Sequence, residues 1–170
     1  MSEETNSEEE MATSPEKFPD NVFPLLGFVG FLGVVLLEIL LGGNLVIFVN
    51  IPSIVMCVGG TLALSLMAFS YDDLAHVLVQ IPRIIFPSRI PKESIHPADP
   101  EVLRGMIVYA YASAAIGLAI GAIQILGDWD ELYSLSLAIK TSLLCPFYSL
   151  LGAEGILRPM AHHLERRLGE

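Results

Sequence analysis

Four long apolar stretches constrain the fold of this chain more than any other feature of its sequence. They cover about residues 23–41, 52–69, 106–126 and 135–157. A helix that crosses a hydrocarbon core of about 30 Å needs roughly 20 apolar residues, and each stretch is close to that length. The sequence therefore predicts an all-α, polytopic membrane protein with four transmembrane helices.

The composition excludes an ordinary soluble domain. Hydrophobic residues make up 53% of the chain and charged residues 16%, whereas soluble domains average about 25% charged residues. A soluble fold of 170 residues would have to hide four helices that are apolar on all sides. A core of that size is too small to cover them.

The net charge of −10 is concentrated at the N-terminus. Residues 1–21 carry seven acidic residues and one basic residue, namely Glu3, Glu4, Glu8, Glu9, Glu10, Glu16 and Asp20 against Lys17. Because this segment has little apolar surface to bury, we expect a disordered acidic tail, followed by one four-helix membrane domain over residues 22–170. No basic patch is interleaved with aromatic residues, so we expect no nucleic-acid partner.

Basic residues indicate how the chain is oriented in the membrane. They lie between the second and third stretches and after the fourth: Arg83, Arg89, Lys92, Arg104, Arg158, Arg166 and Arg167. The other two connections contain no Lys or Arg. Short connections rich in these residues stay on the cytoplasmic side. With four crossings, the pattern predicts that both termini and the proline-rich linker near residue 90 are cytoplasmic.

Three ionisable residues fall inside the apolar stretches, where a charge is costly. Glu38 and Lys140 each lie a few residues from the outer end of their span. They could pair across helices, or both could extend to the nearby interface. Glu154 precedes Arg158 by four residues, the favourable order for an ion pair within one helix, so we expect a structural role for it.

Hydroxyl-bearing residues within the spans are the candidates for an ion path: Thr61, Thr141, Tyr148 and Ser149. Pro146 removes a backbone hydrogen bond from the fourth helix and predicts a kink there. A kinked helix lined by these groups can border a water-filled path, although Ser and Thr in helices often bond to their own backbone. No acidic residue lies near mid-span, so a proton-binding acid would have to come from a partner.

Nothing in the sequence indicates catalysis. Cys57 and Cys145 lie in apolar stretches without CxxC or Cys/His spacing, which favours packed side chains over a metal site or a disulfide. No nucleophile–base pair, phosphate-binding loop or metal cluster is recognisable, and His162-His163 fits a basic tail at the membrane surface. We expect no enzymatic activity, no cofactor and no metal.

Small residues mark the faces on which membrane helices approach one another. Two stretches carry them at helical spacing: Gly27, Gly30 and Gly33 in the first, and Ala110, Ala114, Gly117 and Gly121 in the third. Two such faces predict a compact bundle or an oligomer.

Several motifs follow one another along the chain. Gly42-Gly43 is followed by Ile51-Pro52-Ser53 and then by Val58-Gly59-Gly60-Thr61, where Pro52 opens the second span and the two glycines allow close packing. Later come Ile116 to Gly121, and Phe147-Tyr148 through Ala153 to Pro159. These motifs resemble the glycine-rich turn, the PS…VGGT signature, the IGTVxGL segment and the TTxYGxxxAN…P ending of the MotA/TolQ/ExbB proton-channel family. The resemblance covers roughly residues 25–168.

The resemblance implies a flagellar-stator-type, MotA-like subunit in the lipid of the bacterial inner membrane. Such subunits form a pentameric ring around two helices of a MotB-like, single-span partner and couple ion flow to mechanical work. In the family the partner supplies the proton-binding aspartate, which agrees with the absence of a central acid here.

The chain departs from the family pattern at positions that line the ion path. Tyr111 stands where the family has a proline, Leu118 replaces a threonine, and Cys145-Pro146 replaces two threonines. The cytoplasmic region between the second and third helices is also short. The sequence therefore supports two hypotheses, a proton-channel subunit and a non-conducting membrane scaffold that kept the packing residues but lost the ion path.

Overall fold

The computed structural model describes residues 22–84, 96–127 and 132–169, and within these ranges the regular structure is entirely helical. Three of the described helices are long and apolar enough to cross a membrane, Ile51–Ala68, Asp99–Gly127 and Leu132–Arg166, and the apolar helix Leu26–Leu41 is shorter. The structure thus confirms an all-α membrane protein with about four spans. The predicted acidic tail, residues 1–21, lies outside the described residues.

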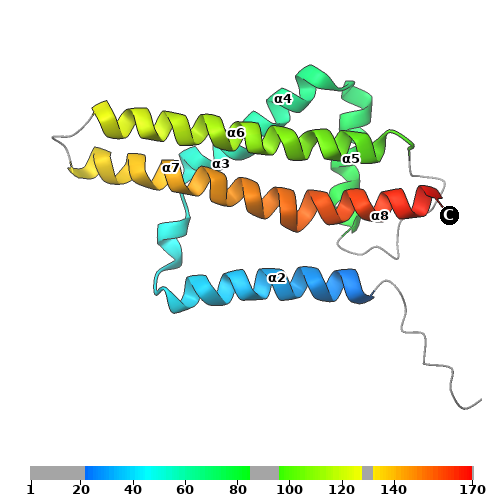
Figure 1. Ribbon diagram of the computed structural model, residues 1–170, viewed down its shortest axis with the longest axis horizontal. Helices are drawn as coiled ribbons and strands as arrows, with labels where there is room; N and C mark the ends of the chain where they lie inside the picture. Colours follow the sequence, from blue (N-terminus) through cyan, green and yellow to red (C-terminus); the bar gives the residue numbers. More distant parts are fainter. Residues whose placement is uncertain (1–21, 85–95, 128–131, 170) are drawn as a thin grey trace, which may run out of the picture.

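Successive spans run in opposite directions (Figure 1). The elements in chain order are α2 (Val22–Leu41), η1 (Leu45–Phe48), α3 (Ile51–Ile54), η2 (Val55–Gly59), α4 (Gly60–Ala68), α5 (Tyr71–Ile84), α6 (Asp99–Gly127), α7 (Leu132–Gly152), η5 (Ala153–Leu157) and α8 (Arg158–Gly169). The segments η2 and η5 are π-helical and join their neighbours into continuous helices. The start of α2, the start of α6 and the end of α8 lie at the same end of the molecule.

The long helices extend beyond the apolar stretches that predicted them. Helix α6 begins at Asp99, seven residues before the expected start of the third span at residue 106. Its first turn contains Asp99 and Glu101 together with Pro100, and acidic residues and proline both favour a helix N-terminus. The fourth span likewise continues through η5 into α8. The apolar stretches of the sequence therefore marked the membrane-spanning part of each helix and not its full length.

Helices α6 and α7 form an antiparallel hairpin in which glycines allow the backbones to approach. A Cβ atom added at Gly117 would lie 2.5 Å from Sγ of Cys145, and one at Gly121 would lie 2.9 Å from the carbonyl oxygen of Ala138. At Gly60, where α4 crosses α6, an added Cβ would lie 2.7 Å from Oγ of Ser113. Gly60, Gly117 and Gly121 therefore have the packing role that the sequence predicted.

Gly59 differs from Gly60 in its surroundings. A Cβ atom added there would meet no atom within 4 Å, so Gly59 makes no close helix contact within the described part of the chain, and its packing role stays a prediction. The residue lies one position before Gly60, which is about 100° around the helix, and therefore faces away from α6.

Three prolines, Pro52, Pro146 and Pro159, lie at different kinds of positions in their helices. Pro52 lies in the first turn of α3, as predicted for a residue that opens a helix. Pro146 lies inside α7, and the helix continues through it without interruption. The π-helical segment η5 comes later and leads into Pro159. A proline ring collides with the carbonyl four residues earlier in a regular α-helix, and the wider π turn relieves that collision.

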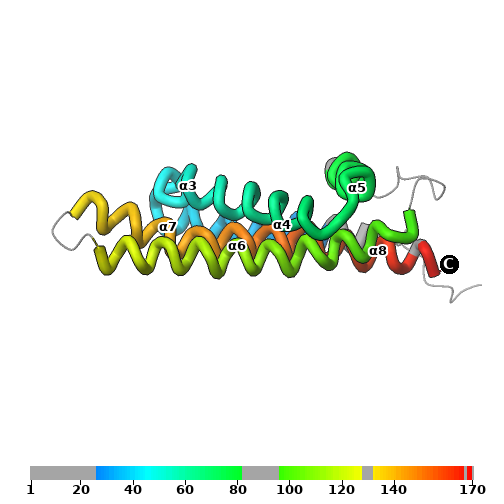
Figure 2. The backbone as a smooth tube through the Cα atoms, turned by 90° about the horizontal axis from the view of Figure 1, so that it is seen from above, coloured from blue at the N-terminus to red at the C-terminus, as the bar shows by residue number. Residues whose placement is uncertain are grey.

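The hydrophobic core of the described residues lies toward the end where α5, the start of α6 and α8 meet. Its apolar side chains are almost fully buried and include Leu74, Val77, Val102, Leu103, Met160 and Leu164. Helix α5 runs across the long helices and is seen end-on in Figure 2. It is separate from the second span, because the backbone of Phe69 is extended and ends α4.

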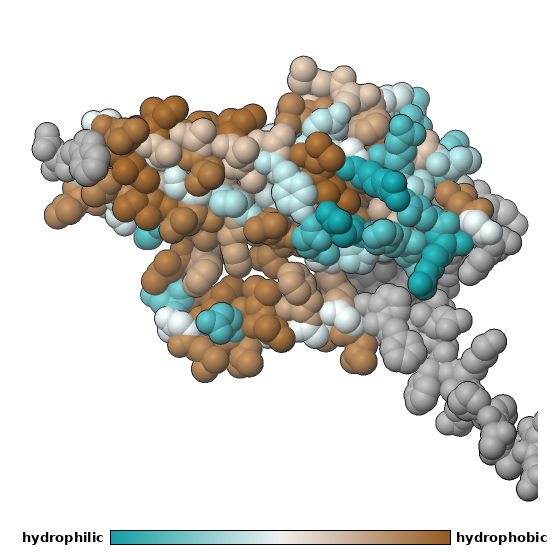
Figure 3. Space-filling view, in the orientation of Figure 1, coloured by the Kyte–Doolittle hydropathy of each residue, from teal (hydrophilic) through white to brown (hydrophobic). Residues whose placement is uncertain are grey.

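Hydrophilic residues gather at the end of the molecule where α5, the start of α6 and α8 meet. Apolar side chains cover α2 and the opposite end of the α6–α7 hairpin (Figure 3). At the hydrophilic end, Arg104 of α6 forms an ion pair with Glu165 of α8, with N and O 2.7 Å apart. The molecule therefore has an apolar, membrane-spanning part and an amphipathic part beside it.

Helix α2 stands apart from the other spans (Figure 1). The ring of Phe31 packs against Gly155 of η5, but Val34 and Leu41 are 68% and 75% exposed. A Cβ atom added at any of its glycines, Gly27, Gly30 and Gly33, would meet nothing within 4 Å. The small-residue face that the sequence predicted for packing is thus not used within the described part of the chain.

We predict that Gly117→Ala lowers the free energy of unfolding in detergent by about 1–3 kcal/mol, because the new methyl group overpacks the α6–α7 contact. Gly59→Ala is the matched control. It adds the same methyl group in open space and should leave stability unchanged or raise it slightly. Equal thermal or denaturant stability of the two variants would contradict this account of the hairpin.

Candidate functional site

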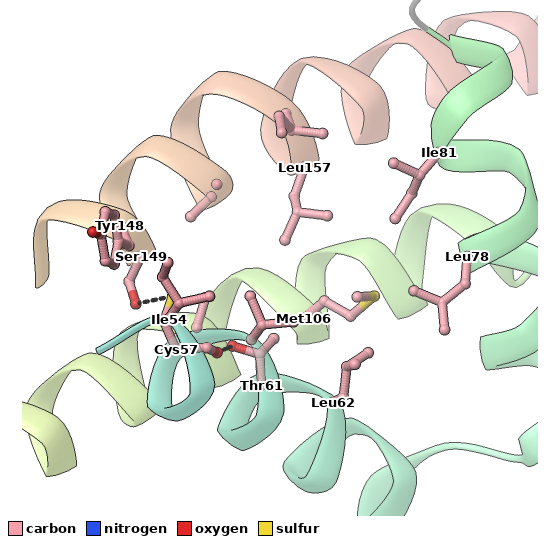
Figure 4. A pocket seen from close by; sticks show the side chains of 15 residues that line it. Ile54, Cys57, Thr61, Leu62, Leu78, Ile81, Met106, Tyr148, Ser149 and Leu157 are labelled. Atoms are coloured by element: carbon pink, nitrogen blue, oxygen red, sulfur yellow. Dashed lines mark hydrogen bonds between the residues drawn. The ribbon is translucent and has the colours of Figure 1, made fainter. Parts of the chain in front are cut away.

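Three of the four predicted ion-path residues line one cavity. It has a volume of about 480 Å³ and lies between the second span, α5, α6 and the α7–η5 helix (Figure 4). Thr61, Tyr148 and Ser149 belong to its wall, but almost the whole exposed surface of the wall is apolar, with Leu62, Leu78, Met106 and Leu157 among its residues. The fourth candidate, Thr141, does not line the cavity.

The hydroxyl groups of Thr61 and Ser149 are already bound within the chain. Thr61 donates a hydrogen bond to the carbonyl of Cys57, at 2.5 Å. Oγ of Ser149 lies 3.0 Å from Sγ of Cys57, a contact drawn in Figure 4. Cys57 therefore joins the second span to α7 through its thiol, while its carbonyl binds Thr61 within the second span itself. The sequence predicted only a packed side chain here, because nothing in an apolar stretch shows which atoms a thiol will meet.

Tyr148 and Thr141 belong to a polar cluster at the entrance to the second span. The hydroxyl of Tyr148 donates to the carbonyl of Phe48 and lies 3.2 Å from the backbone nitrogen of Asn50, which donates to it. Asn50 Nδ2 lies 3.3 Å from Oγ1 of Thr141, whose hydroxyl donates to the carbonyl of Leu137. Backbone groups between η1 and α3 lack hydrogen-bond partners within a helix. The Tyr148 hydroxyl provides partners for two of them, the carbonyl of Phe48 and the N–H of Asn50.

Asn50 is a residue that sequence reasoning missed. Its side chain is 5% exposed, and its Oδ1 atom has no hydrogen-bond partner within the described part of the chain. The sequence did contain a signal, since Asn50 is a lone polar residue between the apolar segment 45–49 and Ile51-Pro52. Its partners, however, lie 91 and 98 residues away.

The two π-helical segments border the cavity from opposite helices. Cys57 and Val58 of η2 line it on one side, and Ala153, Ile156 and Leu157 of η5 line it on the other. A π turn widens the helix and changes which carbonyls are bonded, and such turns are frequent at functional sites. At this level of the membrane, the backbone of both spans departs from the regular α-helix.

The predicted intramembrane charges fall into two groups. Glu154 forms the predicted ion pair with Arg158, at 2.8 Å, and also accepts a hydrogen bond from the hydroxyl of Tyr111. Because Tyr111 belongs to α6, this contact joins α6 to η5. Glu38 and Lys140 are both exposed and take part in no ion pair within the described ranges.

A further polar cluster connects α5 to the start of α6. Asp99 is 1% exposed. Its carboxylate lies 3.0 Å from Nδ1 of His76 and accepts a bond from the backbone N–H of His96, at 2.9 Å. Gln80 also donates to it. The bond from the His96 N–H, three residues earlier, has the i, i+3 spacing of one half of a capping box, so this cluster joins the segment before α6 to α5.

No group of three His, Cys, Asp or Glu within the described ranges could hold a metal ion, and both cysteines are free and buried. The prediction that the chain has no cofactor or enzymatic activity is untested by this finding. The chain's polar side chains bind mainly backbone groups and neighbouring helices.

No model of a known protein family matches this chain, and no curated protein is significantly similar to it. The assignment to the MotA/TolQ/ExbB family therefore stays a prediction that depends on the motifs described above.

We predict that Tyr148→Phe destabilises the connection between α2 and α3. The change removes the donor to the carbonyl of Phe48 and the acceptor for the N–H of Asn50, at a cost of about 1–3 kcal/mol. Limited proteolysis of residues 42–50 should be faster in this variant. Tyr133→Phe, at an 80% exposed tyrosine, is the control and should cleave at the wild-type rate; the same rate for Tyr148→Phe would disprove the role of the hydroxyl.

Proposed function

We propose that this chain is a MotA-like integral membrane subunit that assembles with copies of itself, and with a MotB-like single-span partner, into a proton-channel or stator-type complex. The observation that supports the proposal most is the cavity between the two π-helical segments, lined by Thr61, Tyr148 and Ser149. A channel subunit needs polar side chains inside the apolar layer and a backbone that can rearrange beside them.

The residues of the chain would have distinct roles in such a complex. Hydroxyl groups both donate and accept hydrogen bonds, so Thr61 and Ser149 can pass protons through ordered water once the cavity is hydrated. The acid that carries the proton would come from the partner, because Glu154 is engaged by Arg158 and Tyr111. Exchange of the Ser149–Cys57 contact for a contact with water would open the path.

A second function, a non-conducting membrane scaffold, is favoured by a different observation. The hydroxyls of Thr61, Thr141, Tyr148 and Ser149 all have hydrogen-bond partners within the chain. Such bonds stabilise a helix bundle without any ion passing through it. The scaffold would keep the glycine-mediated packing and provide surfaces for other membrane proteins.

Proton flux into liposomes that contain the chain and its co-purified partner distinguishes the two functions. If the chain conducts, Ser149→Ala should lower the flux about tenfold, an effect of about 1.4 kcal/mol on the barrier, while the protein still folds. Ser136→Ala, which changes an exposed serine outside the cavity, should have no effect. Absence of flux in the wild-type complex would favour the scaffold.

We also propose that the chain lies in the bacterial inner membrane with both termini in the cytoplasm. The support is the distribution of arginines. Arg104 lies near the start of α6, and Arg158 and Arg166 lie in α8, the elements that meet at the hydrophilic end of the molecule (Figure 3), and Lys and Arg favour the cytoplasmic side. Reporter fusions near residue 90 and after residue 170 should both report a cytoplasmic location. Periplasmic signals from both fusions would reverse the proposed orientation. A periplasmic signal from one fusion alone would contradict the proposed number of crossings.

A further inference from the structure

Two intramembrane charges have no counter-charge among the residues that the structure describes. Glu38 of α2 and Lys140 of α7 are exposed and form no ion pair within the described ranges. Charged side chains in a membrane are costly and are usually paired. The two groups have opposite charge, and each is one of very few charges in its apolar stretch.

Both charges lie in the same half of the membrane-spanning part. Glu38 is three residues from the end of α2 at Leu41, and Lys140 is eight residues from the start of α7 at Leu132. At 1.5 Å per residue, these positions are about 5 Å and about 12 Å from their helix ends. Figure 1 shows that α2 ends short of the tip of the α6–α7 hairpin, which reduces this difference in depth.

The connection between α2 and α3 is ordered by hydrogen bonds at both of its ends. Asn44 caps η1 through its side chain, at 3.0 Å from the N–H of Val46. The Tyr148 hydroxyl then binds the carbonyl of Phe48 and the N–H of Asn50. These bonds order the connection between η1 and α3, while the apolar surface of α2 stays uncovered (Figure 3).

We infer that α2 packs against α7 of a second copy of this chain, and that Glu38 of one protomer pairs with Lys140 of the next. This inference rests on the self-assembly proposed above. The contact joins two different surfaces, so it is a head-to-tail interface, and repetition of a head-to-tail interface closes a ring when the rotation permits. The Glu38–Lys140 pair neutralises two charges in the membrane. It also favours a second copy of this chain as the protein that covers the exposed surface of α2.

Cysteine cross-linking between differently tagged chains tests the inference. Glu38→Cys in one chain and Lys140→Cys in the other, co-expressed and oxidised in the membrane, should give a disulfide-linked dimer that carries both tags. Val29→Cys with Lys140→Cys is the matched control, because Val29 is an exposed residue of α2 about 13 Å further along the helix. Cys57 and Cys145 are buried, and the wild-type chain controls for them.

Charge reversal provides the second measurement. Native mass determination should show about a tenfold loss of oligomer for Glu38→Lys or Lys140→Glu alone, and recovery when Glu38→Lys and Lys140→Glu are combined. An oligomer that persists in both single variants and forms no two-tag dimer would overturn the inference, yet leave the proposed function standing. The inference would also be overturned if the Val29→Cys control gave as much two-tag dimer as Glu38→Cys. In a single chain that carries both Glu38→Cys and Lys140→Cys, a disulfide formed only within that chain would overturn it as well. Failure of the proposed function is recognised separately, by wild-type protein that is monomeric and carries no proton flux with its partner.

Discussion

The close approach of α6 and α7 is the contact on which the rest of the structure depends. In lipid there is little hydrophobic force to bring helices together, so their association relies on van der Waals contact and on hydrogen bonds between them. Gly117 and Gly121 remove the side chains that would keep the two backbones apart. Once the hairpin is formed, the second span packs along it through Gly60, and α5 and α8 cover its hydrophilic end.

Buried polar groups then determine how the remaining elements join this hairpin. Cys57, Tyr148 and Asp99 each bind atoms of a different helix or of a connection that lacks helical hydrogen bonds. An unsatisfied polar group in an apolar environment is expensive, so each of these contacts also fixes the position of its element. Cys57 and Tyr148 also line the cavity that the two π-helical segments border.

Sequence reasoning succeeded where the signal was local and failed where it was not. The apolar stretches, the Glu154–Arg158 pair and the opening of α3 at Pro52 all follow from neighbouring residues. Gly59 and Gly60 looked equivalent, yet only Gly60 faces α6, because a step of one residue rotates the side chain by about 100°. Asn50 and Asp99 went unnoticed, since their significance comes from partners on other elements.

The sequence by itself determined that this chain is a helical membrane protein with about four spans, because the length and apolarity of a segment are enough to place it in lipid. Only the tertiary structure decided which hydroxyls share a cavity, which glycines touch a neighbouring helix, and that α2 stands apart from the other spans. These properties depend on the rotation of each helix about its axis and on contacts between residues far apart in the chain, and the hydropathy of a segment carries no information about either.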